Sequence, residues 1–127
     1  MPVASFWDDE EKTIVRGNLV GQWTWDEYHT GISEMAQLVK DIDHRFDQII
    51  DVRESGPLPD GALSHIRRGR QQNPANFGIS VIVGPSEWIK ALVGVMEKAY
   101  GKRTQPTSIA ETIEEAYTII VQQREQE

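Results

Sequence analysis

Cysteine is absent from this chain of 127 residues, so disulfide bonds and thiolate ligands for metals or redox chemistry are excluded. No apolar run is long enough to cross a bilayer, and the amino-terminal stretch "MPVASFWDDEEK" lacks the basic and apolar regions of a signal peptide. These absences predict a cytoplasmic protein without a membrane span. Internal repeats and low-complexity segments are also lacking, and we expect a single domain covering residues 1–127.

Positive charge is scarce, with 13 Lys and Arg against 20 Asp and Glu and a formal net charge of -7. General nucleic-acid binding needs a strongly positive face, so we expect no nucleic-acid partner. Hydrophobic residues make up 39% of the chain and charged residues 26%, which is typical of a globular protein rather than a disordered one.

Runs of apolar and β-branched residues predict strands, and the first two form an antiparallel hairpin around a polar turn. Gly17, inside the second strand, indicates a β-bulge. The five predicted strands cover residues 3–7, 13–20, 46–52, 77–84 and 106–110.

Helical spacing of apolar residues predicts four helices, which begin near Thr24, Asp60, Ser86 and Thr112. Capping boxes begin the first and the last, at Thr24–Glu27 and Thr112–Glu115. The second covers 60–72, with Leu63 and Ile66 facing inward, and the third covers 85–101. The buried stripe expected on the third helix consists of Ile89, Leu92, Val93, Met96 and Tyr100.

The elements therefore follow the order β-β-α-β-α-β-α-β-α. After the hairpin, strands and helices alternate, which requires parallel strands joined by helical crossovers. We expect the α/β class, with a mixed, largely parallel sheet.

This order, together with several short segments, resembles the STAS-like domains (sulfate transporter and anti-sigma-factor antagonist), in particular the small bacterial proteins of that fold. The segments are "GQWTWDEYHTGISEM" after the hairpin, "DQIIDV" ending in Asp51, "PDGAL", "GISVIVG" and "TIEEAYTII". The resemblance covers nearly the whole chain and implies a non-catalytic regulatory module that acts by protein–protein interaction. It implies a kinase-like anti-sigma factor as the partner, with a homodimer as the alternative assembly.

In anti-sigma-factor antagonists of this family, a serine in a segment like Asp-Ser-Ser-Gly-Leu is phosphorylated by the partner kinase. The corresponding residues here are Asp60, Gly61, Ala62 and Leu63, so a glycine stands where the family has the reactive hydroxyl. The resemblance therefore implies that the usual phosphorylation is missing. Ser55 and Ser64 are the alternatives nearby, because a helix amino terminus favours a phosphate.

One basic cluster, "HIRRGR", occurs in this acidic chain. We expect Arg67, Arg68 and Arg70 on or beside the exposed face of the second helix, where they would bind an acidic partner or an anionic ligand. A solvated helix end explains the same residues without a partner. With Asp60, Gly61 and Ser64, these arginines form the predicted docking set.

An enzyme would use the polar residues after the third strand, which are Asp51, Glu54, Asp60 and His65. However, Arg53 stands where an aspartyl phosphohydrolase needs its second aspartate, and Asp60 has a simpler role as a helix cap. His29, His44 and His65 lie far apart without a metal-ligand spacing. We therefore expect no catalytic activity, no metal and no cofactor.

Four tryptophans are many for this length. Trp23 and Trp25 flank Thr24, so in an extended chain only one of them would face the core. An apolar pocket between sheet and helices is the basis of the alternative function, binding of a small molecule or lipid in the manner of Sec14-like carriers. A chain of this length leaves little room for a lipid-sized cavity beside its core.

Overall fold

The structure is a computed structural model that describes residues 2–71, 73–100 and 107–126. The elements within these ranges confirm the α/β class. The strands are β1 (Val3–Trp7), β2 (Ile14–Leu19), β3 (Phe46–Asp51), β4 (Phe77–Val83) and β5 (Thr107–Ala110). The helices are α1 (Trp25–Val39), α2 (Ala62–Arg70), α3 (Glu87–Tyr100) and α4 (Ile113–Glu125).

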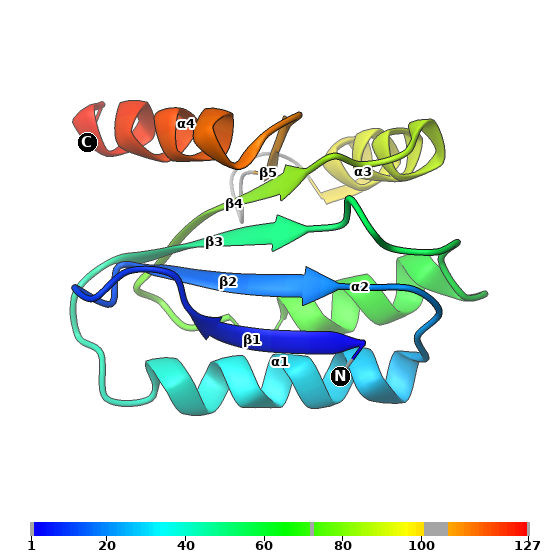
Figure 1. Cartoon of the computed structure of the whole chain (residues 1–127), viewed down its shortest axis with the longest axis horizontal. Coiled ribbons are helices and arrows are strands. Elements are labelled where there is room, and N and C mark those ends of the chain that lie inside the picture. Colours follow the sequence, from blue (N-terminus) through cyan, green and yellow to red (C-terminus); the bar gives the residue numbers. More distant parts are fainter. Residues whose placement is uncertain (1, 72, 101–106, 127) are drawn as a thin grey trace.

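The five strands form one mixed sheet in the order β1-β2-β3-β4-β5 (Figure 1). β1 pairs with β2 antiparallel, and the remaining neighbours are parallel. Because each crossover moves one strand further in the same direction, α1, α2 and α3 lie on one face of the sheet. α4 follows the last strand and covers β3, β4 and β5 from the other face.

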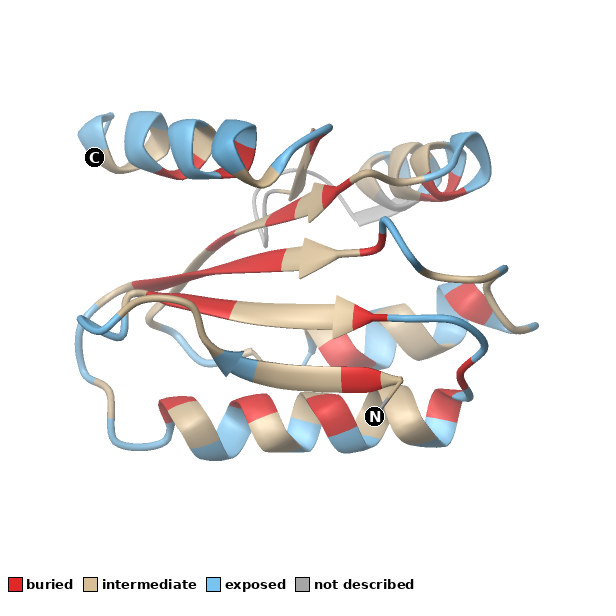
Figure 2. Ribbon diagram, in the orientation of Figure 1, coloured by how far each residue is buried: buried red, intermediate tan, exposed pale blue. Residues whose placement is uncertain are grey.

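Each face of the sheet has its own apolar core, because successive side chains of a strand point to opposite faces. The face under α4 buries Ile49, Val81 and Ile120. The opposite face buries Val3, Leu19 and Leu92, together with Trp23 and Trp25 at the start of α1. Figure 2 shows that the buried residues of the helices lie on the sides that face the sheet.

Both Trp23 and Trp25 are buried, at 6% and 8% exposure, whereas an extended chain would have let only one of them face the core. Thr24 is the N-cap of α1 and completes the predicted capping box with Glu27. Trp25 is already helical, and the chain is therefore not extended across all three residues. The two indole rings meet edge to face, with their centroids 5.0 Å apart.

Several local predictions differ from the structure. Gly17 pairs in regular register with Ser5 and Ile50, so β2 contains no bulge there. Ser86 accepts a hydrogen bond from the Ile89 amide, which agrees with its predicted role as an N-cap. Thr112 accepts the amide of Glu115, but the Glu115 carboxylate accepts the amide of Glu111, so the predicted capping box at Thr112 is incomplete. The expected ends at Gln72, Gly101 and Pro106 lie outside the described residues, as do the side chains of Met96 and Tyr100.

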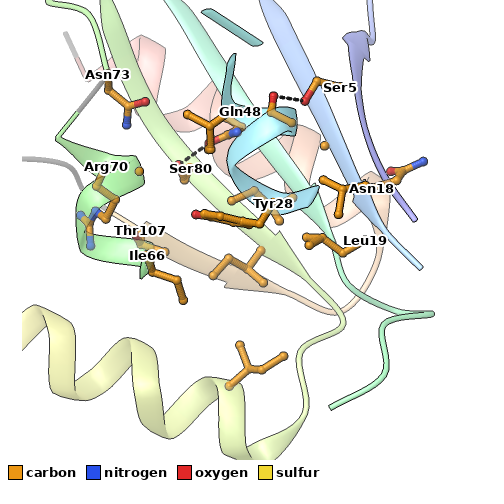
Figure 3. Close-up of a pocket in the computed structure, with 18 of the residues that line it drawn as sticks. Ser5, Asn18, Leu19, Tyr28, Gln48, Ile66, Arg70, Asn73, Ser80 and Thr107 are labelled. Carbon is orange, nitrogen blue, oxygen red and sulfur yellow. Dashed lines mark hydrogen bonds between the residues drawn. The ribbon is translucent and has the colours of Figure 1, made fainter. Parts of the chain in front are cut away.

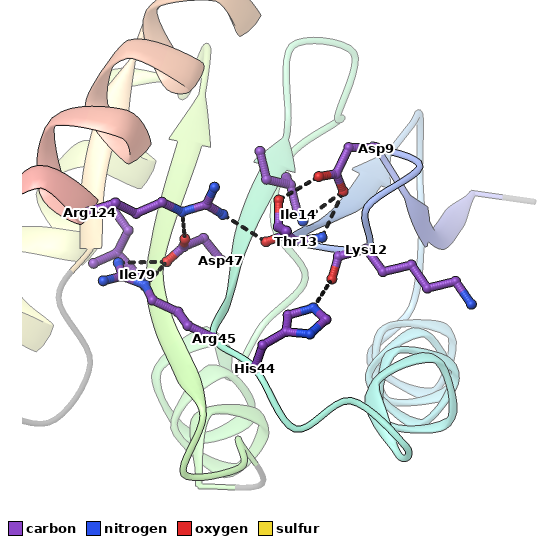
Figure 4. Close-up of polar contacts among 9 residues, drawn as sticks. All are labelled: Asp9, Lys12, Thr13, Ile14, His44, Arg45, Asp47, Ile79 and Arg124. Atoms are coloured by element: carbon purple, nitrogen blue, oxygen red, sulfur yellow. Dashed lines mark hydrogen bonds and ion pairs between the residues drawn. The ribbon is translucent and has the colours of Figure 1, made fainter.

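A buried carboxylate, Asp47, joins α4 to the sheet at the amino ends of the parallel strands (Figure 4). The β3–β4 register shifts beside it, and its Oδ1 accepts the amide of Ile79 at 2.8 Å. The guanidinium of Arg45 binds the same oxygen, and that of Arg124 binds Oδ2 at 2.8 Å. A Cβ on Gly78 would lie 2.1 Å from Asp47 Oδ1, and only glycine leaves room for this network.

Candidate functional site

The predicted docking residues lie in the loop after β3 and in α2, and we call the loop 54–60 together with the exposed face of α2 the docking surface. The loop leaves the carboxyl end of a central parallel strand, where α/β proteins commonly place their functional groups. α2 then returns antiparallel to the strands on the face shared with α1 (Figure 1).

α2 begins at Ala62, two residues after the predicted start at Asp60, and its N-cap is Gly61. Gly61 has φ +85°, a left-handed conformation that costs other residues about 1–2 kcal/mol. Asp60 contributes through its backbone instead, since its carbonyl oxygen accepts the indole N–H of Trp25 at 2.6 Å. Glycine at position 61 therefore matches a backbone requirement of this chain.

The exposed face of α2 combines one apolar side chain with two cations. Leu63, expected to face inward, is 44% exposed, because the buried stripe of this short helix passes through Ala62, Ile66 and Gly69. Arg67 and Arg68 are exposed as predicted, and Ser64 is exposed as well. α2 contains no acidic residue, so its own charged side chains contribute only positive charge to this face.

Arg70 is separated from the other two arginines. Its side chain is half-buried and lines a cavity between α2 and the sheet (Figure 3). Burial lowers the pKa of Arg70, while the nearby Tyr28 and Glu97 act in the opposite direction. The structure therefore divides the predicted cluster, with Arg67 and Arg68 on the docking surface and Arg70 on the cavity.

Two histidines that are distant in sequence meet at the α1–α2 contact. His29 Nε2 and His65 Nδ1 lie 2.9 Å apart, so one ring donates and the other accepts. The His65 ring also stacks on Trp25, with centroids 4.8 Å apart. Spacing within the sequence did not suggest this pair, because the two residues belong to different helices. Among the described residues, no group of three or more potential metal ligands surrounds it.

The surroundings of His29 shift its pKa, and the shift determines how this residue affects stability as the pH changes. The pKa of His29 lies below its ordinary value, first because of burial and then because of Arg68 and His65, while Asp26 acts in the opposite direction. Since the folded pKa is lower than the unfolded one, His29 contributes stability above about pH 6.5 and loses it as the pH falls further. We therefore expect protonation of His29 at low pH to lower the stability of the fold.

The two candidate serines differ in accessibility. The Ser55 hydroxyl accepts the indole N–H of Trp23 at 3.0 Å and donates to the carbonyl of Gly56 at 2.9 Å. Ser55 also forms an isolated bridge with Gly21, which holds the loop against the β2–α1 connection. Ser64 lies exposed on α2. A modifying enzyme would thus reach Ser64 without breaking a hydrogen bond to a tryptophan.

Asp51, the central residue of the catalytic alternative, forms ion pairs with arginines. Arg53 binds it with Nη2 at 2.8 Å from Oδ2, and Arg16 approaches the same oxygen at 3.3 Å. The hydrogen bond from Arg53 is the main cause that lowers the pKa of Asp51 to about 2, although burial opposes it. The carboxylate therefore remains ionised near neutral pH and is a poor proton acceptor there.

A groove of about 650 Å³ lies between the loop after β3 and the start of α3. Pro57 and Leu58 line it from the loop, and Trp88, which is 58% exposed, lines it from α3. Gly84 permits this arrangement, because a Cβ there would lie 2.3 Å from Arg53 Cγ. The sequence did not indicate the exposure of Trp88, which depends on how α3 packs.

No protein-family model and no curated protein matches this chain. In the described parts of the chain, no helix has both the length and the hydropathy that a membrane span requires.

Proposed function

We propose that this chain is a non-catalytic regulatory module of the STAS-like type, whose docking surface binds an acidic segment of a protein partner. The main support for this proposal is the outward face of α2, where Leu63, Arg67 and Arg68 are all exposed. An apolar anchor surrounded by cations suits a partner segment with an apolar side chain among carboxylates.

Charge distribution supports an acidic partner. The chain as a whole carries a net charge of -7, whereas α2 contains three arginines and no carboxylate. A partner with negative charge would be attracted to this helix and repelled by most of the remaining surface, which favours one orientation of binding.

Rigid attachment of α2 supports recognition by a preformed surface. The hydrogen bond from Trp25 to the Asp60 carbonyl, the Trp25–His65 stack and the His29–His65 contact all hold the start of α2 against α1. Preorganised surfaces lose less conformational entropy when they bind.

The resemblance extends this proposal to a kinase-like anti-sigma factor as the partner. Because Gly61 has no hydroxyl, docking would proceed without phosphorylation at that position. Ser64, exposed beside Leu63, is the residue at which a phosphate would add negative charge to the docking surface and weaken binding of an acidic segment. Asp51 serves in this proposal as an ion-paired structural residue rather than as a catalytic base.

Site-specific photo-crosslinking tests the proposal. A photoreactive residue at Leu63, in the cells that produce the protein, should crosslink to an acidic segment identified by mass spectrometry. The same residue at Val95, which is 52% exposed on α3, is the matched control. Crosslinks confined to Val95 would contradict the proposal, and crosslinks from Leu63 to a second copy of the chain would replace the hetero-partner with a homodimer.

Charge reversal then tests the identified complex with purified components. We expect Arg67→Glu to weaken binding at least tenfold at low salt, because it replaces an attractive charge with a repulsive one. Lys98→Glu, an equal change of charge on the exposed side of α3, should alter binding much less. Equal effects of the two substitutions would show that only net charge matters and that α2 is not the docking surface.

A further inference from the structure

The first strand, β1, lies at one edge of the sheet and pairs with β2 on its inner side only. The Asp8 amide donates to the Ile14 carbonyl at 2.8 Å, which shows which residues bond across this ladder. Because hydrogen-bonded pairs alternate along an antiparallel ladder, the even-numbered residues of β1 bond to β2. The N–H and C=O groups of Val3, Ser5 and Trp7 therefore point outward, and we call this side of β1 the free edge.

The sequence of β1 contains none of the usual devices that prevent pairing with another chain. Natural edge strands commonly carry a charge, a proline or a β-bulge for this purpose. The strand "VASFW" has no charged residue and no proline, and its register with β2 is regular. Within the described parts of the chain, no hydrogen bond reaches the outward backbone groups of the free edge. The free edge is therefore able to accept a further strand.

The helix α1 runs along β1 and limits what can pair with the free edge (Figure 1). The Ser5 hydroxyl donates to the Gly31 carbonyl at 3.0 Å, and a Cβ on Gly31 would lie 2.7 Å from Val3 Cγ1. Neighbouring strands are about 4.8 Å apart, whereas packed helices need about 8–10 Å between their axes. Two copies of this chain paired through β1 would thus force their α1 helices into the same space. The free edge suits a lone extended segment rather than a second copy.

Negative charge lies beside the free edge on α1. Gly31 faces β1 and Ile32 lines the cavity toward α2, so Glu34 lies on the opposite flank of α1, next to the free edge. The Glu34 carboxylate is half-buried and forms no ion pair with another described residue. Glu27, two helical turns earlier, lies on the same flank and also caps α1. A segment with lysine or arginine on this face would be attracted to the free edge.

The other face of an added strand would contact an apolar side chain. Because successive side chains alternate along a strand and Ser5 faces α1, Phe6 points to the opposite face of the sheet. Phe6 is 40% exposed, and an added strand would place every second side chain beside it. The segment that fits the free edge therefore alternates basic residues with apolar residues.

We propose that the free edge of β1 binds an extended segment of another protein by strand addition, with basic side chains near Glu34 and apolar side chains beside Phe6. In this mode of recognition, main-chain hydrogen bonds supply affinity and alternate side chains supply specificity. The docking surface on α2 is a different surface, because α2 packs on the other flank of α1. The inference therefore does not depend on the proposed function.

Amide hydrogen exchange of the whole chain, measured by nuclear magnetic resonance, tests the proposal with a short synthetic peptide of alternating lysine and valine. The amides of Val3, Ser5 and Trp7 should exchange at least tenfold more slowly when the peptide is present. The amides of Ala4 and Phe6, which already bond to β2, should change much less. A peptide with glutamate in place of lysine should give no protection at the same concentration.

Each result contrary to these expectations overturns a named part of the proposal. Equal protection by the lysine and glutamate peptides would overturn the choice of a basic segment. Absence of protection at millimolar lysine peptide, or protection confined to α2, would overturn the site. Protection of the free edge without peptide, in a chain that dimerises, would replace the peptide with a second copy.

Two substitutions at one position form a matched pair for isothermal titration with the lysine peptide. Ser5→Pro removes an outward N–H without removing a hydrogen bond to β2, and it should abolish binding. Ser5→Ala loses the same hydroxyl contact with Gly31 but keeps the N–H, and it should bind like the original chain. Undiminished binding by a folded Ser5→Pro protein would contradict strand addition.

Charge reversal on α1 gives a second test that does not change the strand, and it decides the matter if proline prevents folding. Glu34→Lys should weaken binding of the lysine peptide at least tenfold, because it replaces attraction with repulsion beside the free edge. Glu125→Lys, an equal change of charge at an exposed position of α4, should alter binding much less. Equal effects of the two substitutions would show that the peptide responds only to net charge.

Discussion

The role of a polar residue in this protein depends on the residues that surround it in the fold. Asp47 is fully buried, yet it is satisfied by two guanidiniums and one backbone amide. Asp60, which the sequence suggests as a helix cap, acts through its carbonyl oxygen on an indole. Polar residues of the same type therefore stabilise this fold in different ways, and the difference lies in burial.

The buried aspartate leads to a prediction on stability. Asp47→Ala should lower the free energy of unfolding by about 3 kcal/mol, because Arg45 and Arg124 lose their shared carboxylate and the Ile79 amide loses its acceptor. Urea denaturation followed by circular dichroism measures this loss. Asp43→Ala, at an exposed position four residues earlier, should remain within about 0.5 kcal/mol of the original protein. Similar losses for both would contradict a specific role of the network.

At the scale of elements, helix ends show which local signals are reliable. The capping box at Thr24 forms as predicted, because its partners are three residues apart and need no tertiary contact. α2 departs from the prediction, since Gly61 begins the helix in a left-handed conformation. Its inward face was also predicted only in part, because Leu63 lies in the first turn, away from α1 and the sheet.

Two glycines, one at the N-cap of α2 and one inside α3, provide a matched pair of substitutions. Gly61→Ala should lower the free energy of unfolding by about 1–2 kcal/mol, because alanine is strained at φ +85°. Gly94→Ala, inside α3 with no described atom outside the backbone of its own helix within 4 Å of the added Cβ, should raise it by about 1 kcal/mol. Thermal and urea denaturation of both variants measure these changes. A stabilising Gly61→Ala would show that the chain does not need a left-handed residue before α2.

For the whole molecule, the two faces of the sheet are covered unequally. Three helices pack on one face, and α4 alone covers the other over β3, β4 and β5. Ala116 and Ile120 of α4 are completely buried there against Ile49 and Val81. The stability of this face therefore depends on one terminal helix.

Removal of α4 should consequently prevent stable folding. A chain that ends at Glu111 exposes the apolar face of the sheet, and burial of Ile120 alone contributes about 1.5–3 kcal/mol. Since domains are stable by only about 5–15 kcal/mol, we expect loss of the cooperative thermal transition and association on size-exclusion chromatography. A chain that ends at Glu125 keeps all of α4 and should melt like the original. A monomeric, cooperatively melting short form would contradict this expectation.

What the sequence by itself determined is the succession of elements. Apolar periodicity, the hairpin turn and the cap at Thr24 depend on residues close together in the chain, and the α/β class and the mixed sheet follow from their order. The STAS-like resemblance remains a prediction, and so does the docking function, which concerns a partner that a single chain does not contain.

Only the tertiary structure decided which distant side chains meet. The His29–His65 contact, the burial of both tryptophans and the Asp47 network join residues from separate elements. The separation of Arg70 from Arg67 and Arg68 depends on which side of α2 packs on the sheet. The cavity is lined by residues of the sheet, Gly17 among them, and of α1, α2 and α3, and it therefore depends on packing that local sequence does not encode.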